Sequence, residues 1–521
     1  MKLIIVHYHL RPGGIRRVIE LATPHLVREA PRPITRVLLA TGQRADEEWH
    51  EQFSRRLPDV PVEVFVERSF NYLSEQRASP RSITAHMRHA LEKLLTDADA
   101  GNCLVWAHNL GVGRNLLLSR ELVSACAARD ISLVSHHHDW WFDNRWTRWP
   151  EMRRFGFRTL TSPAHAVFPQ TDILIHAAIN HADAAILEGH CGKRALWLPN
   201  LTEPAPQLPA AHVCVARRWL ENRLAHGDDP VWFLPCRTLR RKNIAEALLL
   251  TRWLRPEAWL VVTGAASSAD EAPYFRALET AAHQHHWRLR LGVLAGDESR
   301  KPGVAELFAA SEAVLLTSIQ EGFGLSYLEA ASAQRPLIAR RLPNIAPDLD
   351  RFGFRFPQAY DEIFVTPDLF NWRSECARQA RLLRDWRAAM PSPVRELVSL
   401  PPVLAAERPC PVPFSRLTLT AQIEVLVRPT RESWEACVAL NPFLEEWRSR
   451  AAVGRLRVTP WPRTAKRWLG GDAYARRFFD ALRARPRHHF RRFSAVMLQT
   501  EFIEKKLATV NLYPLLWNKR T

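Results

Sequence analysis

Short apolar runs recur at helix-length intervals along most of this 521-residue chain. Each run is continuous rather than alternating, which is typical of strands in a parallel sheet whose two faces are both covered. The intervening stretches have helical periodicity, so the pattern predicts an α/β fold with two doubly wound regions. We expect strands at residues 3–8, 35–40, 62–66, 103–107, 131–135, 172–175 and 195–198, and in the second region at 231–234, 259–263, 289–294, 313–317 and 336–339.

Two proline-rich stretches interrupt this rhythm, one beginning at Thr202 and the other spanning residues 391–413. A chain of this length exceeds what one compact core usually holds, so we interpret both stretches as linkers. The predicted organisation is an N-terminal domain at 1–201, a linker at 202–212, a second domain at 213–390, a proline-rich linker at 391–413 and a partly helical C-terminal extension at 414–521 that packs back on the first domain.

The composition limits the partners and the compartment. Lys and Arg number 72 against 54 Asp and Glu, a net charge of +18 that favours phosphate, nucleic acid or anionic lipid without choosing among them. Eight scattered cysteines without a C-x-x-C pattern are typical of reduced thiols in a cytosolic protein. No apolar segment approaches the roughly 20 residues of a membrane helix, so we expect a cytoplasmic protein with at most peripheral contact at the inner face of the membrane.

A glycine loop between two glutamates follows the run at 313–317. Gly322 and Gly324 allow close backbone approach to a ligand, and the helix expected at 325–334 directs its dipole and free N–H groups at the loop. Glu321 and Glu329 offer acceptors at two depths, which suits a ligand rich in hydroxyls. An ordinary strand-to-helix crossover with Glu329 on a solvated face is the alternative.

A basic turn lies between the run at 231–234 and the helix expected from Ile244. Cations at the start of a helix oppose its dipole unless an anion binds there, and guanidinium and ammonium groups together suit a diphosphate. A solvated basic turn remains the alternative. The four cations are Arg237, Arg240, Arg241 and Lys242.

The first domain offers its own polar groups at strand ends. Gly13 and Gly14 follow the first strand as a weak phosphate-type loop, which an unliganded turn would match equally well. The stretches 136–139 and 108–109 end neighbouring strands, so their histidines are candidates for substrate contact and proton handling. We predict no metal there, because adjacent residues on an extended strand point to opposite faces.

Taken in order, these pieces resemble retaining glycosyltransferases of family 4, which have the GT-B architecture of two facing Rossmann-like domains. The resemblance covers about the first 390 residues. It rests on Gly13-Gly14-Ile15, His138-Asp139, Leu198-Pro199-Asn200, Arg237 with Lys242, and the E-x7-E motif from Glu321 to Glu329.

The resemblance implies a metal-independent hexosyltransferase that needs no cofactor and takes a nucleotide-diphosphate sugar as co-substrate. Arg237 and Lys242 would hold the diphosphate, Glu329 the ribose, and Glu321 with the loop backbone the transferred sugar. His138 and Glu321 would be the catalytic residues. The remaining implied contacts are Gly13, Gly14, Gly322, Phe323, Gly324 and Leu325 for the donor, and His108, Asn109 and Asp139 for substrate.

The chain departs from the family pattern at two places, one at the predicted phosphate site and one beyond the two predicted domains. Asn243 stands where the family often has glycine, and the region beyond Met390 is longer than the fold needs. The acceptor is therefore left open as a glycan, a lipid or a small molecule. The alternatives are a sugar-nucleotide-binding protein of this fold without transferase activity, an epimerase or a phosphorylase.

The C-terminal extension raises two further alternatives. Nucleic acid is not expected as a partner, although arginines interleaved with aromatics at 478–493 would suit it if the rings were not core. The apolar run Phe493–Ile503 predicts a helix that packs on another domain, with Phe493, Val496, Met497 and Ile503 on one face. The other possibility is contact with anionic membrane through that face and the cations Arg491, Arg492, Lys505 and Lys506.

Overall fold

The computed structural model describes residues 1–521 apart from 145, 225–228, 267, 297–300, 485–491 and 518–521. The chain forms two compact units, each assembled from separate segments. Unit 1 contains residues 1–203, 389–397 and 464–506, and unit 2 contains residues 204–388, 398–463 and 507–521.

Unit 1 is built on a parallel sheet with the strand order β3-β2-β1-β4-β5-β6-β7. Its strands are buried apolar runs, as the sequence predicts, and their bounds lie within two residues of the expected ones at most ends. They are β1 (Lys2–His7), β2 (Arg36–Thr41), β3 (Val62–Val66), β4 (Cys103–His108), β5 (Ser132–His137), β6 (Leu174–Ala178) and β7 (Ala195–Trp197).

Helices alternate with these strands, and several of them begin at a side-chain cap. Asp46 accepts a hydrogen bond from the Trp49 backbone at 2.8 Å, and Ser79 caps a helix that has Pro80 in its first turn. The helices of the first segment are α1 (Gly14–Glu29), α2 (Glu47–Ser54), α3 (Pro80–Leu94), α4 (Leu116–Ala127), α5 (Trp149–Arg154), α6 (Thr161–Val167) and α7 (His181–Cys191). The later segments add α15 (Ser392–Arg395), α20 (Lys466–Leu469), α21 (Gly471–Ala484) and α22 (Ala495–Leu507).

Unit 2 has a second parallel sheet, with the order β10-β9-β8-β11-β12-β13. Its strands are β8 (Val231–Arg237), β9 (Trp259–Gly264), β10 (Leu289–Arg290), β11 (Ala313–Leu316), β12 (Leu337–Arg340) and β13 (Gln358–Tyr360), and β14 (Phe364–Val365) pairs antiparallel with β15 (Val412–Pro413). The helices are α8 (Ala210–Glu221), α9 (Ile244–Leu254), α10 (Ala272–Gln284), α11 (Val304–Ala310), α12 (Leu325–Ser332), α13 (Ala346–Phe352), α14 (Trp372–Ala388), α16 (Pro402–Ala405), α17 (Leu419–Val427), α18 (Thr430–Cys437) and α19 (Phe443–Ala452). Two parallel sheets with a mainly helical C-terminal region confirm the predicted fold class.

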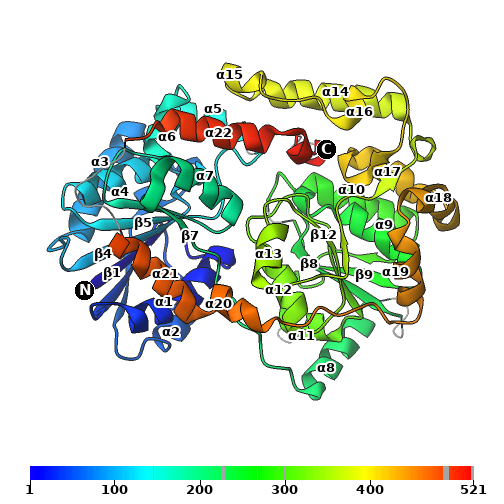
Figure 1. The fold of residues 1–521 in the computed structure, drawn as a ribbon, viewed down its shortest axis with the longest axis horizontal. Coiled ribbons are helices and arrows are strands. Elements are labelled where there is room, and N and C mark those ends of the chain that lie inside the picture. Colours follow the sequence, from blue (N-terminus) through cyan, green and yellow to red (C-terminus); the bar gives the residue numbers. More distant parts are fainter. Residues whose placement is uncertain (145, 225–228, 267, 297–300, 485–491, 518–521) are drawn as a thin grey trace. The chain divides into compact units, whose positions relative to one another are not determined.

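The C-terminal extension is divided between the two cores rather than forming one segment. Helix α21 lies beside α1 (Figure 1), and its Tyr474 and Phe478 are fully buried in the unit 1 core. Helices α17 and α19 instead bury Val425 and Leu444 in the unit 2 core. The compact units therefore divide the chain differently from the sequence boundaries, because each of these helices has an apolar face that a different core covers.

Helix α22 packs on α6 and α7 within unit 1 (Figure 1) through a face shifted from the predicted one. Leu498 and Phe502 are fully buried, whereas Met497 is 65% exposed. The Nζ of Lys506 lies 3.1 Å from a carboxylate oxygen of Asp143 and 3.3 Å from one of Asp183, so this cation is paired inside unit 1.

Several residues that would form a nucleic-acid or membrane surface on this extension are buried or lie outside the described part of the chain. Phe478 and Phe479 are core residues and offer no face for base stacking. Arg485, Arg487, Phe490 and Arg491, on which those alternatives also drew, lie outside the described residues. Within the described part of the chain, no helix combines the length and apolar character that crossing a membrane requires.

Replacing Phe502 by alanine tests the packing of α22. The Phe502 ring centroid lies 4.7 Å from that of Trp140 and 6.0 Å from that of Phe168, so Phe502→Ala should lower the free energy of unfolding by about 3–5 kcal/mol. Met497→Ala on the exposed face is the control and should change it by less than about 0.5 kcal/mol. Urea unfolding followed by tryptophan fluorescence measures both. A Phe502→Ala protein of unchanged stability that no longer sediments with anionic vesicles would instead support a membrane-bound helix.

Candidate active site

Two loops of unit 2 meet because their strands are neighbours in the sheet. β8 pairs with β11 in parallel, so the loop after each strand emerges at the same edge. The loop after β8 carries Arg241 and Lys242, and the loop after β11 carries Glu321. Arg241 donates a hydrogen bond to Glu321 Oε2 at 2.7 Å, and Lys242 donates one to Glu321 Oε1. A basic turn and a carboxylate almost 80 residues apart thus form one charged cluster.

The charge state of Glu321 is set by this cluster. Burial by itself would raise the pKa of the carboxyl group, but Arg241 and Lys242 outweigh burial and lower the pKa to about 2. Glu321 therefore remains ionised throughout the physiological pH range. An anion held beside two cations at the start of a helix leaves positive potential available for a further anionic group.

The glycine loop has a defined backbone. Gly324 adopts a left-handed conformation with φ of 78°, and a Cβ at this position would lie 2.9 Å from the Tyr327 ring, so glycine is required there. Helix α12 begins directly afterwards at Leu325. The Asn344 side chain donates to the Glu321 backbone oxygen at 2.9 Å and fastens the loop from its other side. Phe323 is buried in this arrangement.

The four cations of the basic turn have different surroundings, which the sequence does not reveal. Arg240 is buried and donates to the Asp270 backbone oxygen at 2.7 Å and to Glu271 at 3.3 Å. Arg237 is exposed at the end of β8, and Glu329 is exposed in the second turn of α12. The structure brings Lys242 together with Glu321, and it adds Arg241, which the family resemblance did not assign a role.

Asn243 occupies the position where the family often has glycine, and it adopts the backbone conformation that the loop requires. Its backbone is left-handed, with φ of 47° and ψ of 54°, a conformation that asparagine tolerates better than most residues. Its side chain donates to Glu246 at 3.0 Å and accepts from Gln422 of α17 at 3.1 Å. The C-terminal extension therefore supports the basic turn from behind.

Unit 1 brings three histidines together at the ends of β4 and β5. His108 and His136 are register partners on the two strands, and His138 follows two residues later on the same side. His108 Nδ1 lies 3.1 Å from His138 Nε2. Burial lowers the pKa of His136 to about 3 and, together with the neighbouring imidazoles, holds the pKa values of His108 and His138 well below the ordinary value. All three rings are neutral at physiological pH.

Asn109 holds the loop that carries His138 and Asp139. Its backbone is left-handed, and its side-chain oxygen accepts hydrogen bonds from the backbone N–H groups of His138 at 2.8 Å and Asp139 at 3.1 Å. The Asn109 amide oxygen thereby shapes this loop, and the predicted contact of Asn109 with substrate stays a prediction. The role of Asp139 as a substrate contact stays a prediction.

Gly13 and Gly14 are not required by local packing. Gly13 is extended, with φ of 166°, and a Cβ on Gly14 would meet no atom within 4 Å. This open space is compatible with the predicted close approach of a phosphate, which remains a prediction.

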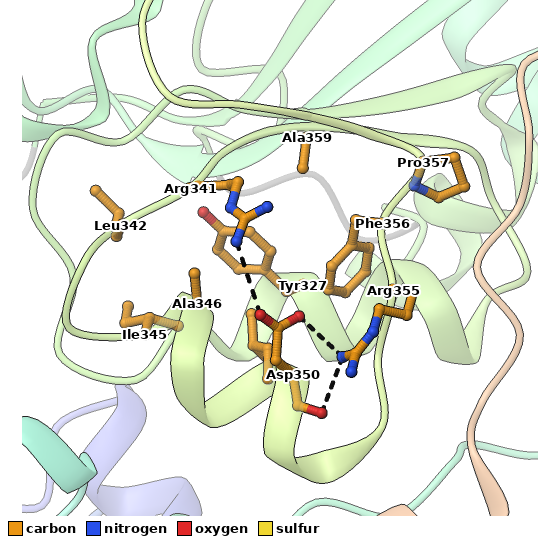
Figure 2. Close-up of a pocket in the computed structure, with 11 residues that line it drawn as sticks. Tyr327, Arg341, Leu342, Ile345, Ala346, Asp350, Arg355, Phe356, Pro357 and Ala359 are labelled. Atoms are coloured by element: carbon orange, nitrogen blue, oxygen red, sulfur yellow. Dashed lines mark hydrogen bonds and ion pairs between the residues drawn. The ribbon is translucent and has the colours of Figure 1, made fainter.

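A separate cavity of about 170 Å³ opens on unit 2 between α12, α13 and β13. Figure 2 shows Tyr327 and Phe356 among the rings and aliphatic side chains that line it, with Asp350 at its edge paired to Arg355 at 2.9 Å and to Arg341 at 3.7 Å. None of Arg241, Lys242 and Glu321 lines this cavity, so it is distinct from the charged cluster.

Comparisons with known proteins identify the class to which this arrangement belongs. The fold is shared with sucrose-phosphate synthase from Thermosynechococcus elongatus, with a TM-score of 0.51, 13% identity and coverage of 93% of this chain and 98% of that one. The HepE protein of Anabaena, solved with UDP and glucose, has a TM-score of 0.46 and 18% identity over 67% of this chain and 82% of that one. Two Rossmann-like units of this kind define the GT-B fold.

A match to a known protein family lies within the sequence of unit 2. Residues 217–349 match the family described as glycosyl transferases group 1, and this segment contains both loops of the charged cluster. Over this segment the chain is similar to the glycosyl transferases group 1, in agreement with the resemblance to family 4. Among curated proteins it is 24% identical over 347 residues to mannosylglucosyl-3-phosphoglycerate synthase of Petrotoga mobilis. The match covers 65% of this chain and 65% of that relative, slightly under two thirds of its length.

Substituting Asn243 tests the support of the basic turn. Asn243→Ala should destabilise the protein by about 2–3 kcal/mol, because alanine disfavours the left-handed backbone and the hydrogen bonds to Glu246 and Gln422 are lost. Asn243→Gly is the matched control, since glycine loses the same hydrogen bonds but adopts this backbone freely, and it should cost about 1 kcal/mol less. Thermal unfolding of the two variants measures the difference. Equal melting temperatures would show that the left-handed backbone carries no cost.

Proposed function

We propose that this chain is a retaining glycosyltransferase that moves a sugar from a nucleoside-diphosphate sugar to an acceptor. The observation that carries the proposal is the convergence of Arg241 and Lys242 on the ionised Glu321 beside the start of α12, inside the segment that matches the family. Fixed cations and helix N–H groups are suited to a leaving diphosphate, whose negative charge grows as the glycosidic bond breaks.

The proposed roles divide the cluster between the two halves of the donor. Lys242, Arg237 and Arg241 bind the diphosphate, and Glu329 binds the ribose. Glu321 contacts the transferred sugar with the backbone of the 322–325 loop. His138, Gly13 and Gly14 of unit 1 keep the roles that the family resemblance gives them.

The acceptor is proposed to be a small phosphorylated or carboxylated sugar derivative. The Petrotoga relative is named for the synthesis of mannosylglucosyl-3-phosphoglycerate, an anionic product, and a net charge of +18 favours anionic partners. A panel of nucleotide sugars crossed with phosphoglycerate glycosides, neutral oligosaccharides and lipid-linked sugars tests this choice. Turnover restricted to neutral or lipid-linked acceptors would overturn it.

We propose the cytoplasm as the place of action. The described cysteines are all free thiols, five of them buried, which fits a reducing compartment.

A binding protein of this fold without transferase activity is the competing function, and Glu321→Gln separates the two. Glutamine keeps the shape of the side chain but not its charge, so transfer should fall by at least about 100-fold while donor affinity stays within a few-fold. Isothermal calorimetry and turnover should be measured on one preparation. Lys242→Ala is the matched contrast, because losing a hydrogen bond to a charged group should weaken donor binding by about 1.5–3 kcal/mol. A Glu321→Gln protein with wild-type turnover would remove Glu321 from the mechanism.

The cations of the basic turn also predict how transfer responds to hard metal ions. Since Arg and Lys side chains meet the charge of the diphosphate, adding Mg²⁺ or Mn²⁺ should leave the initial rate of transfer unchanged. The measurement is a titration of each ion at fixed donor and acceptor. A rate that rises and saturates with Mg²⁺ would show that the diphosphate needs a metal that the basic turn does not replace.

A further inference from the structure

Adjacent residues on an extended strand point to opposite faces, but residues two apart point to the same face, so a metal can be bound by alternate histidines of the run. His136 and His138 lie on the same side of their strand, and the register of β4 and β5 places His108 opposite His136. His137 faces the other side, where its Nε2 lies 3.1 Å from His176 Nδ1. Three imidazoles thus converge from two neighbouring strands, and their potential ligand atoms all lie within 4.8 Å of one another.

The two ring nitrogens of His136 have the surroundings that are usual for a metal-ligating histidine. His136 Nε2 lies 3.2 Å from the Leu198 backbone oxygen, which can only accept, so Nε2 carries the proton and Nδ1 keeps its lone pair. That Nδ1 is buried and has no hydrogen-bond partner. An imidazole that donates one N–H to a backbone carbonyl and presents its other nitrogen unprotonated is the usual arrangement of a metal-ligating histidine.

The other two rings place a pair of nitrogens at a separation that suits one ion. His108 Nδ1 and His138 Nε2 are 3.1 Å apart, close to the roughly 3.3 Å that separates two nitrogen ligands at about 2.0–2.1 Å around a tetrahedral ion. Without an ion, one of these two nitrogens carries a proton and donates a hydrogen bond to the other. His108 Nε2 is buried without a partner, and a proton moved to that atom would free Nδ1 for coordination.

We propose that His108, His136 and His138 form a binding site for one borderline divalent transition-metal ion, of which Zn²⁺ is the representative. Neutral imidazole is a ligand that Zn²⁺, Co²⁺ and Ni²⁺ favour, whereas Mg²⁺ requires oxygen ligands. Three protein ligands leave a tetrahedral ion one further position.

The site shares His138 with the proposed transfer reaction, so its test uses metal binding alone and its outcome does not depend on turnover. The tag-free, full-length protein is dialysed against EDTA, then titrated with Co²⁺, whose visible spectrum reports tetrahedral coordination. We expect saturation at about one Co²⁺ per chain with intense bands in the visible region, and competition by Zn²⁺ but not by Mg²⁺.

A matched pair of variants locates the ion. His136→Ala removes a ligand and should abolish the Co²⁺ bands, whereas His137→Ala alters an equally buried neighbour on the opposite face and should leave them. Zinc K-edge absorption of the wild-type protein is the second measurement, which does not depend on a variant that folds. It should show three imidazoles at about 2.0–2.1 Å. Absence of stoichiometric Co²⁺, bands that persist in a folded His136→Ala protein, or a zinc shell without imidazole would overturn the proposal.

Discussion

Parallel pairing of adjacent strands is the constraint on which both polar clusters of this protein depend. Because parallel strands all end at one edge of the sheet, loops that are far apart in sequence become neighbours there. In unit 2 the pairing of β8 with β11 brings Lys242 to Glu321. In unit 1 the pairing of β4 with β5 brings His108 to His136 and His138. The apolar strand residues therefore determine the positions of the charged and titratable ones, although they contact no substrate themselves.

This constraint explains how much the sequence could predict. A buried strand is a local apolar run, so the strands of both sheets and helices such as α9 and α12 could be located from periodicity, and their order implied which loops would meet. The different surroundings of the four cations could not be predicted. Arg240 pairs with Glu271 and Arg241 with Glu321, and both partners come from distant segments of the chain. The histidines were expected at neighbouring strand ends, but the convergence of His108, His136 and His138 was not, because the parity rule was applied to adjacent residues and not across the register of two strands.

The C-terminal extension was the least predictable part, since helix periodicity shows which face is apolar but not which core will cover it. The spacing of Phe478 favours a core position, as found, but it does not show which core would cover the ring until α21 is seen against α1. In α22 the run of apolar residues is wide enough to define several faces, and the buried one contains Leu498 and Phe502 rather than Met497. Non-local packing decided each of these cases.

The extension also acts on the candidate active site through a buried polar network in unit 2. Arg340 of β12 donates to both carboxylate oxygens of Glu246, at 2.5 and 2.6 Å, and Glu246 also accepts from the Asn243 side chain and the Tyr360 hydroxyl. These charges are almost fully buried, and breaking such a pair would leave an uncompensated charge in the core. Asn243 directly follows Lys242, and its side chain also accepts a hydrogen bond from Gln422 of α17 in the extension. The basic turn is therefore held from behind by groups that cannot move without a large cost, while Arg237 at the end of β8 is exposed. Pre-organised cations of this kind stabilise developing charge because no free energy is spent on reorienting them during the reaction.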